Sequence, residues 1–244
     1  SLPNYLHVMS YILRMIEEGE HLHQDFKLRV DDPHKIAKTI AAFANSEGGR
    51  LLIGVRDSGE VAGCNVEEEF HMMQCAAEMH CTPSVHFETQ IWKHQYFSVL
   101  EVRIAKSPQR PHFVEQRSPN GEPIVGKWDA FLRKQDRIHK ASPVMVKVWQ
   151  YEMRMERSEF RYDEHVGRLF TKWREGKDFR FAQVARTTRL SFEETEDLLA
   201  LLTVWGIVEA RYGKKGHRYG LASEEALSRL ESEGADAFRW KHAG

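Results

Sequence analysis

The chain has 244 residues, of which 41% are hydrophobic and 29% charged, and its formal net charge is −1. These proportions are typical of a soluble globular protein with one large domain or two ordinary ones. No apolar run approaches the roughly 20 residues that span a bilayer, and no basic-then-apolar leader opens the sequence, so we expect a cytoplasmic protein that does not contact membranes.

The first quarter of the chain predicts a helix, a strand and a second helix. Apolar residues recur at three- and four-residue intervals over 4–18, which predicts an amphipathic helix that either packs on its own domain or mediates a homodimer. Residues 20–30 alternate in polarity and predict an extended segment. Within it, Glu20 turns towards Asp25 only if the strand opens with a turn or bulge. Asp32 and Pro33 are typical of a helix start.

The stretch from Ala41 to Gly63 predicts a helix end, a tight turn and a buried strand. Gly48 and Gly49 suit the turn, because glycine adopts positive φ angles without steric cost. Residues 51–55 are apolar without interruption, which favours a strand buried on both faces. Asp57 follows at the end of this strand, where its side chain can leave the core and take part in chemistry.

The middle of the chain continues as a mixture of helices and strands. Residues 66–80 predict a helix, and residues 84–92 and 96–104 predict two strands. Asn120-Gly121 is a hairpin-type turn signal. Residues 130–142 predict a basic strand and turn, and residues 143–158 a further helix.

The last 80 residues have a different pattern. One helix is predicted around Val166 to Trp173, a short second one from Phe181, and a third from the capping box at Ser191. Residues 207–221 then predict a hairpin. Three helices followed by a hairpin resemble a winged-helix domain, a variant of the helix-turn-helix.

Two segments together resemble a known family. Residues 20–27 supply a Glu, then an acidic residue five positions later followed by Phe-Lys. Residues 41–59 supply Ala-Phe-Ala-Asn at a helix end, Gly-Gly, and an apolar strand that closes in Gly-Val-x-Asp-x-Gly. This combination resembles the Schlafen AlbA-like domain, also called the divergent AAA domain. The resemblance covers roughly the first 150 residues and implies a mixed α/β domain there. Together with the winged-helix pattern of the last 80 residues, it leads us to expect an α+β protein, with a Schlafen AlbA-like domain over 1–158 followed by a winged helix-turn-helix domain over 159–244.

Three acidic residues are the candidate catalytic and metal-binding groups. In some Schlafen proteins, three acids at matching positions support endoribonuclease activity on transfer RNA, and the resemblance places them here at Glu20, Asp25 and Asp57. Carboxylates that meet in one place repel one another unless a hard cation such as Mg²⁺ or Mn²⁺ lies between them. Such an ion would activate water for attack on a phosphate. Asp25 is one methylene shorter than the usual Glu of the family, which changes the geometry available to a metal.

Ordinary structural roles are the alternative for these acids. A carboxylate also serves turns and helix caps, and Asp57 precedes Ser-Gly, a favoured turn sequence.

The distribution of basic residues predicts a polyanionic partner. Residues 51–100 contain two basic and seven acidic side chains, whereas residues 101–150 contain ten basic and five acidic ones. The alternative is a solvated surface with no partner. Basic residues near the first acids, in the segment from 130 to 142 and in the hairpin of the last domain are candidates for phosphate contact: Lys27, Arg133, Lys134, Arg137, Lys140, Lys214, Lys215 and Arg218.

The third helix of the last domain argues against groove recognition. Its first turns carry four acids, which would oppose DNA phosphates: Glu193, Glu194, Glu196 and Asp197. Contact with nucleic acid, if this domain makes it, is therefore expected from the hairpin. Protein contact is the alternative.

Two other kinds of site find little support. The cysteines and histidines from Cys64 to Cys81 do not have the usual Cys-x₂₋₄-Cys spacing of a structural zinc site, although His71 and Cys75 would share a helix face. Three cysteines also argue against a disulfide scaffold. No Gly-x-x-x-x-Gly-Lys-Ser/Thr segment is present to bind ATP.

Three hypotheses follow for the function. The first is a DNA-binding regulator of transcription, and the second a metal-dependent endoribonuclease that acts on structured RNA. The third is a protein-interaction module that does not bind nucleic acid. Mg²⁺ or Mn²⁺ is the cofactor implied by the second hypothesis, and DNA or structured RNA is the partner implied by the first two.

Overall fold

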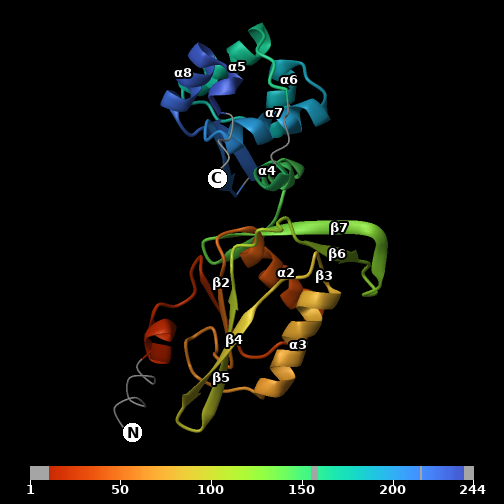
Figure 1. Ribbon diagram of the computed structural model, residues 1–244, viewed down its shortest axis with the longest axis vertical. Helices are drawn as coiled ribbons and strands as arrows, with labels where there is room; N and C mark the ends of the chain where they lie inside the picture. The colour runs from red at the N-terminus through yellow and green to blue at the C-terminus, as the bar shows by residue number, and fades with distance from the viewer. Residues whose placement is uncertain (1–10, 155–158, 215, 239–244) are drawn as a thin grey trace. The chain divides into compact units, whose positions relative to one another are not determined.

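A computed structural model describes residues 11–154, 159–214 and 216–238 of the chain (Figure 1). The chain forms two compact units that divide between Ala141 and Ser142. The sequence places the domain boundary later, between 158 and 159, and residues 155–158 lie outside the described part. The two boundaries differ by the helix α4 (Pro143–Arg154). This helix belongs to the second unit, because its Val144 and Val148 join the core there.

The first unit contains a four-stranded mixed sheet in the order β1-β2-β5-β4. Its strands are β1 (Gln24–Lys27), β2 (Gly49–Ile53), β5 (Phe97–Ile104) and β4 (Glu88–His94). β1 and β2 are parallel, with Asp25 opposite Leu51, whereas the β2–β5 and β4–β5 pairs are antiparallel. The predicted strands over 84–92 and 96–104 therefore form a hairpin at one side of this sheet.

Both faces of this sheet are covered by helices. Leu51, Ile53 and Leu100 point to one face, where they pack with residues of α2 (Pro33–Asn45) and α3 (Val66–Met79). Leu52 and Val99 point to the other face and pack with the helical residues 11–17. This explains the uninterrupted apolar run of β2. The predicted helix over 4–18 is therefore present from residue 11, and residues 4–10 lie outside the described part.

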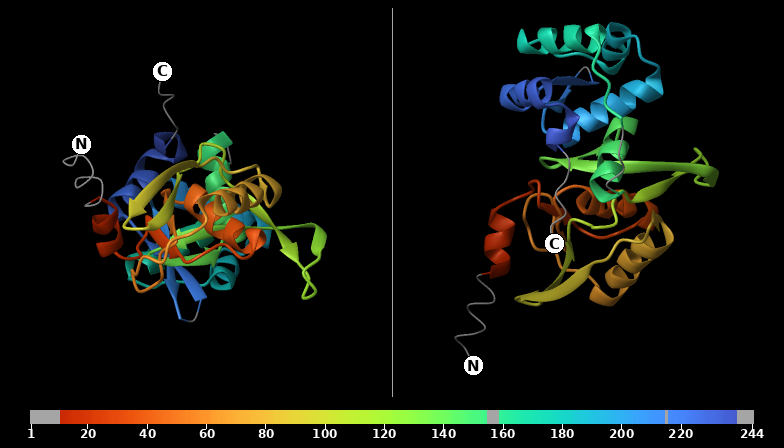
Figure 2. Two further views of the ribbon diagram at one scale, coloured as in Figure 1. Left: turned by 90° about the horizontal axis from the view of Figure 1, so that it is seen from below. Right: turned by 45° about the horizontal axis from the view of Figure 1, so that its top comes forward.

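A second sheet of the first unit has the order β3-β6-β7-β8. Its antiparallel strands are β3 (Cys81–Thr82), β6 (Phe113–Arg117), β7 (Pro123–Lys134) and β8 (Arg137–Lys140). The hairpin of β6 and β7 projects from the first unit as an arm (Figures 1 and 2). At its base, Val114 joins the core around α2.

The turn between α2 and β2 has no room for side chains. Gly48 has a φ angle of +72°, and a Cβ atom there would lie 2.8 Å from the carbonyl oxygen of Ile104. The Gly48 N–H donates to the carbonyl of Phe43, which closes the end of the helix. The predicted glycine turn is confirmed, and it fixes the entry of β2 beside β1.

The second unit has its own core of helices and one hairpin. After α4 come α5 (Glu164–Arg174), α6 (Phe181–Thr188), α7 (Phe192–Val204), β9 (Val208–Gly213), β10 (Gly216–Leu221), α8 (Glu224–Glu233) and the short helix η1 (Ala235–Phe238). β9 and β10 pair in antiparallel, and Phe179 adds one further antiparallel bridge to Tyr219 of β10. Three helices and a hairpin thus follow one another in the predicted order.

Helix α7 is covered by its neighbours. Its residues Leu198 to Leu202 are all buried, and five consecutive buried positions leave no exposed stripe along that part of the helix. Lys147 of α4 donates to Asp197 at 2.7 Å and lies 3.4 Å from Glu196, while the Tyr151 hydroxyl also donates to Asp197. Two of the four acids of the third helix therefore hold α4 in place.

In the described part of the chain, no helix is long and apolar enough to cross a membrane.

Candidate functional site

A turn before β1 brings two of the three predicted carboxylates together. His21 and Gln24 exchange backbone hydrogen bonds, so the chain turns back on itself between them. Oε1 of Glu20 then accepts a hydrogen bond of 3.1 Å from the backbone N–H of Phe26, and its carboxyl lies beside that of Asp25. The turn that the sequence left open is present, and it pairs Glu20 with Asp25.

The carboxyl of Asp25 is buried between two cations. Its Oδ2 lies 2.9 Å from Nζ of Lys27, and its Oδ1 lies 4.0 Å from the guanidinium of Arg133. The Asp25 side chain is only 8% exposed and that of Arg133 only 1%. The negative charge of Asp25 is therefore balanced by side chains of the protein itself.

Arg133 has a structural role that the sequence did not predict. Its guanidinium donates to the carbonyls of His21, Leu22 and Gln24, and it lies over the ring of Phe43 at 4.6 Å. A side chain with 1% exposure, whose Nε and Nη2 donate to carbonyls of the protein itself, has almost no surface left for an external phosphate. The predicted phosphate contact of Arg133 is corrected accordingly: this residue holds the turn that carries Glu20 and Asp25.

Asp57 does not join the other two acids. It lies exposed in the turn that follows β2, and no contact joins its carboxyl to that of Glu20 or Asp25. Among residues 11–154, 159–214 and 216–238, no group of three His, Cys, Asp or Glu side chains is arranged to hold a metal ion. Because Lys27 and Arg133 already face Asp25, these three acids do not fit a divalent ion here.

The Glu20–Asp25 pair makes a testable contribution to stability. Burial and a hydrogen bond to Asp25 raise the pKa of Glu20 above its usual 4.5, although the Phe26 N–H acts in the opposite direction. A carboxyl whose pKa is raised by folding costs stability as pH rises from 4.5 through the folded pKa. We therefore expect Glu20→Gln to raise the melting temperature at pH 7.5 and to lose this gain by pH 4.

The matched control for this test is Glu17→Gln, an exposed glutamate on the preceding helix. A lower melting temperature for Glu20→Gln at pH 7.5 would contradict the prediction, because it would mean that attraction to Lys27 and Arg133 outweighs repulsion from Asp25.

The other predicted phosphate ligands of the first unit lie at the surface. Lys134 and Arg137 are exposed and directly opposite each other across the two-residue turn between β7 and β8. Lys140 is 63% exposed and pairs with Asp129 at 2.8 Å. Lys27 is 37% exposed and pairs with Asp25. Three exposed cations therefore lie on this hairpin, whereas Lys27 lies beside the carboxyl of Asp25.

In the second unit, two of the three predicted hairpin residues can be placed. Lys214 and Arg218 are exposed on the β9–β10 hairpin, and Lys215 lies outside the described residues. Arg180 lies next to Arg218 of the hairpin and is exposed. It is not among the phosphate ligands predicted from the sequence. The pattern of Phe179 before Arg180 gave no signal of a strand, because a single bridge has no detectable period.

Cys64, His80 and Cys81 make polar contacts within the first unit. Cys81 is buried and donates to the carbonyl of Ala37, and burial raises the pKa of its thiol to about 12. Cys64 donates to the carbonyl of Ile53. His80 pairs with Glu115 at 2.6 Å.

Comparison with known proteins identifies the family of the first unit. The crystal structure of the DIP2311 protein from Corynebacterium diphtheriae is similar at 16% identity with a TM-score of 0.41. The similarity covers 88% of this chain, which spans 38% of the length of that protein. No curated protein matches the chain. The family model described as Schlafen, AlbA_2 matches residues 20–142, from Glu20 to the end of the first unit. That segment is half of the chain, and the chain therefore belongs to the Schlafen AlbA_2 family.

Proposed function

We propose that this protein binds nucleic acid through its phosphates and acts as a DNA-binding regulator of transcription. The observation that carries the proposal is the tip of the β7–β8 hairpin, where Lys134 and Arg137 lie exposed and directly opposite each other. Exposed cations on neighbouring strands can contact successive phosphates of one nucleic-acid backbone, and such contacts release counterions, which favours binding.

The mode of contact follows from which cations are exposed. Phosphate contacts position a protein on a duplex, whereas contacts to base edges read its sequence. Helix α7 is poorly suited to enter a groove, because α4 covers it and its acids are exposed at its start or paired with Lys147. Binding is therefore expected to depend strongly on salt and weakly on sequence.

Charge reversal at the hairpin tip tests the proposal. Three phosphate contacts, from Lys134, Arg137 and Lys140, would weaken binding about 40-fold between 50 and 200 mM salt. The double variant Lys134→Glu/Arg137→Glu is expected to bind a 30-base-pair DNA duplex at least about tenfold more weakly, with a salt slope shallower by about 2. Fluorescence anisotropy at four salt concentrations measures both quantities.

The matched control has the same change of charge elsewhere in the first unit. Arg29→Glu/Lys93→Glu alters two exposed cations, of which Arg29 pairs with Asp31 and Lys93 donates to Ser98. It should bind like the wild type. Equal affinities for the wild type and the hairpin variant, at unchanged melting temperature, would refute phosphate contact at this hairpin. Absence of salt-sensitive binding in the wild type would leave the protein-interaction hypothesis instead.

Cleavage of structured RNA is the second candidate function. The observation in its favour is the pairing of Glu20 with Asp25, because burial and the neighbouring Asp25 carboxyl raise the pKa of Glu20, and a carboxyl with a raised pKa beside a second carboxyl is typical of acid–base sites. Mixed transfer RNA, incubated with Mg²⁺, Mn²⁺ or EDTA, separates the candidates. Cutting that vanishes in Glu20→Gln would favour the nuclease, and metal dependence would further require Asp57 or another ligand to move towards the pair.

A further inference from the structure

The second unit carries a row of arginines across three neighbouring segments. In the β9–β10 register, Arg218 lies opposite Arg211. On the other side of β10, Phe179 and Tyr219 exchange both backbone hydrogen bonds, at 2.9 and 2.7 Å. The next position on each segment places Arg180 beside Arg218, and Arg180 still has an extended backbone with φ −70° and ψ 158°. The backbone positions of three arginines are therefore neighbours across the sheet.

These arginines lie on the outer face of the hairpin. Val208 and Tyr219 point inwards, and both belong to the buried core of the second unit. Since side chains alternate along a strand, Arg211 and Arg218 point the opposite way, and both are exposed. Arg180 is also exposed.

On this face, Asp178 and Glu209 both pair with the same arginine, Arg211. Arg211 donates to Asp178 at 2.7 Å and to Glu209 at 3.0 Å. Its guanidinium lies over Gly220, where a Cβ atom would come within 2.6 Å of its Nη1. The absence of a side chain at Gly220 thus lets Arg211 lean away from Arg218 towards Asp178.

Arg180 and Arg218 are left without acidic partners. In the described part of the chain, no carboxylate forms an ion pair with either guanidinium. Lys214 adds a third exposed cation in the turn of the hairpin. Two adjacent like charges cost stability in a sheet, and a planar guanidinium is well suited to bidentate contact with phosphate.

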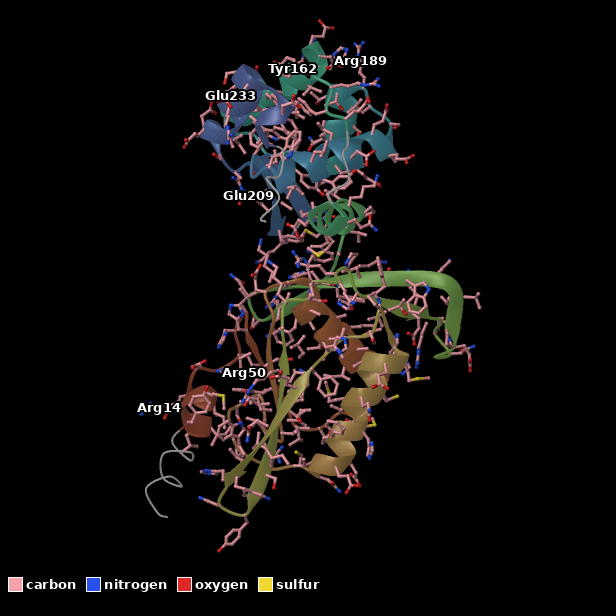
Figure 3. The ribbon with its side chains drawn as sticks, in the orientation of Figure 1. Arg14, Arg50, Tyr162, Arg189, Glu209 and Glu233 are labelled. Carbon is pink, nitrogen blue, oxygen red and sulfur yellow. The ribbon has the colours of Figure 1, made fainter. Side chains whose placement is uncertain are left out.

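We infer that Arg180 and Arg218 form a second phosphate-binding surface, by which the sheet of the second unit, and not its helix α7, contacts the nucleic-acid backbone. This inference rests on the proposed function and adds a second point of contact to it. Arg189, the C-cap residue of α6, does not belong to this surface, since Figure 3 shows it at the opposite end of the second unit from Glu209, which lies beside Arg211. Two linked contacts raise the affinity for a long polyanion more than for a short one.

The test removes both charges and keeps the polar character of the side chains. Full-length Arg180→Gln/Arg218→Gln is titrated with a 30-base-pair DNA duplex and, separately, with a 30-nucleotide RNA. The variant is expected to bind about tenfold more weakly at 100 mM salt, with a salt slope shallower by about 2, because each arginine that contacts a phosphate contributes about 1 to that slope. A loss confined to one of the two probes identifies which backbone the surface binds.

The matched control is Arg161→Gln/Arg229→Gln, which removes the same charge from arginines paired with Glu159 and Glu233. Weaker binding by the control as well would overturn the inference, since net charge alone would then explain the effect. Binding equal to that of the wild type by Arg180→Gln/Arg218→Gln, together with loss in Lys134→Glu/Arg137→Glu, would also overturn it and leave the proposed function intact. A wild type that binds neither probe would overturn both.

Discussion

Arg133→Ala is expected to destabilise the first unit by about 3–5 kcal/mol, enough to unfold it at physiological temperature. The substitution removes a buried guanidinium that donates to the carbonyls of His21, Leu22 and Gln24. It also leaves the buried carboxyl of Asp25 with Lys27 as its remaining cation. Several polar groups would thus be left unsatisfied in a water-excluded place, which is among the costliest outcomes of a single substitution.

The measurement is chemical denaturation of the full chain, followed by circular dichroism. Lys134→Ala is the matched control, because it removes the neighbouring cation from an exposed position and is expected to change stability by less than about 0.5 kcal/mol. Arg133→Lys should also be clearly less stable than the wild type, because an ammonium cannot reproduce the planar set of donors that reaches several carbonyls. Its loss of stability can equal or exceed that of Arg133→Ala. A stable Arg133→Ala protein that loses only nucleic-acid binding would show that Arg133 is a contact residue.

The segment that identifies the family is explained by the position of Arg133. The ring of Phe43 lies beneath its guanidinium, and the hydroxyl of Ser46 accepts a hydrogen bond from its backbone N–H at 2.9 Å. Gly49 lies against the ring of Phe43, too close for a Cβ atom. The end of α2 and its glycine turn therefore support the arginine that holds Glu20 and Asp25 in place.

Local features of the first unit could be predicted from the sequence because their causes are local. The Gly48-Gly49 turn follows from the conformational freedom of glycine, and the burial of Leu51 to Ile53 follows from an apolar run with no polar interruption. The pairing of Glu20 with Asp25 was left open, because it depends on a turn between His21 and Gln24 that has no distinctive residue pattern.

The role of Arg133 could not be predicted, because its partners are distant in sequence. His21 is 112 positions away, and only the folded register of β7 beside α2 brings the two together. In the sequence, Arg133 is one of several cations in a basic strand, and nothing distinguishes it from Lys134. Strand alternation separates the two in the structure, since neighbouring residues point to opposite faces of the sheet.

A similar limit applies to α7. The sequence predicts that the acids at its start oppose phosphate contact, but the partners of these acids could not be deduced from it. Asp197 lies 50 positions from Lys147, and the pair forms only because α4 packs with the second unit. The packing of α4 on α7 is thus a property of the tertiary structure. It favours the hairpin over the third helix as the element that contacts nucleic acid.

Asn45→Ala is expected to destabilise the first unit by about 3 kcal/mol through the loss of three buried hydrogen bonds. The side-chain amide of Asn45 donates to the carbonyls of His112 and Phe131 and accepts from the backbone N–H of His112. Asn45 is 1% exposed, so water cannot replace these contacts without opening the structure. One side chain therefore ties the end of α2 to β7 and to the segment before β6.

The matched control is Asn65→Ala, which removes the exposed N-cap of α3 and should cost about 1 kcal/mol. Denaturant titration of both variants gives the comparison. Equal losses for the two would contradict the buried role of Asn45. Asn45→Asp adds a second test, because its buried carboxylate would face two carbonyls at neutral pH. Its pKa would be raised by folding, so the variant should gain stability as pH falls and the carboxyl becomes protonated.

Asn45 and Arg133 should also be coupled, because both act on the same part of β7. Asn45 binds the carbonyl of Phe131, two residues before Arg133, and Ser46 binds the N–H of Arg133 itself. If Asn45 positions β7, the loss of Asn45 already weakens the contacts of Arg133, and the double variant should lose less stability than the sum of the single ones. If the loss of stability in the double variant equals the sum of the two single losses to within about 0.5 kcal/mol, the two residues stabilise the unit independently. Non-additivity would instead identify the end of α2, β7 and the turn from His21 to Gln24 as one cooperative unit, which holds the carboxyls of Glu20 and Asp25 in place.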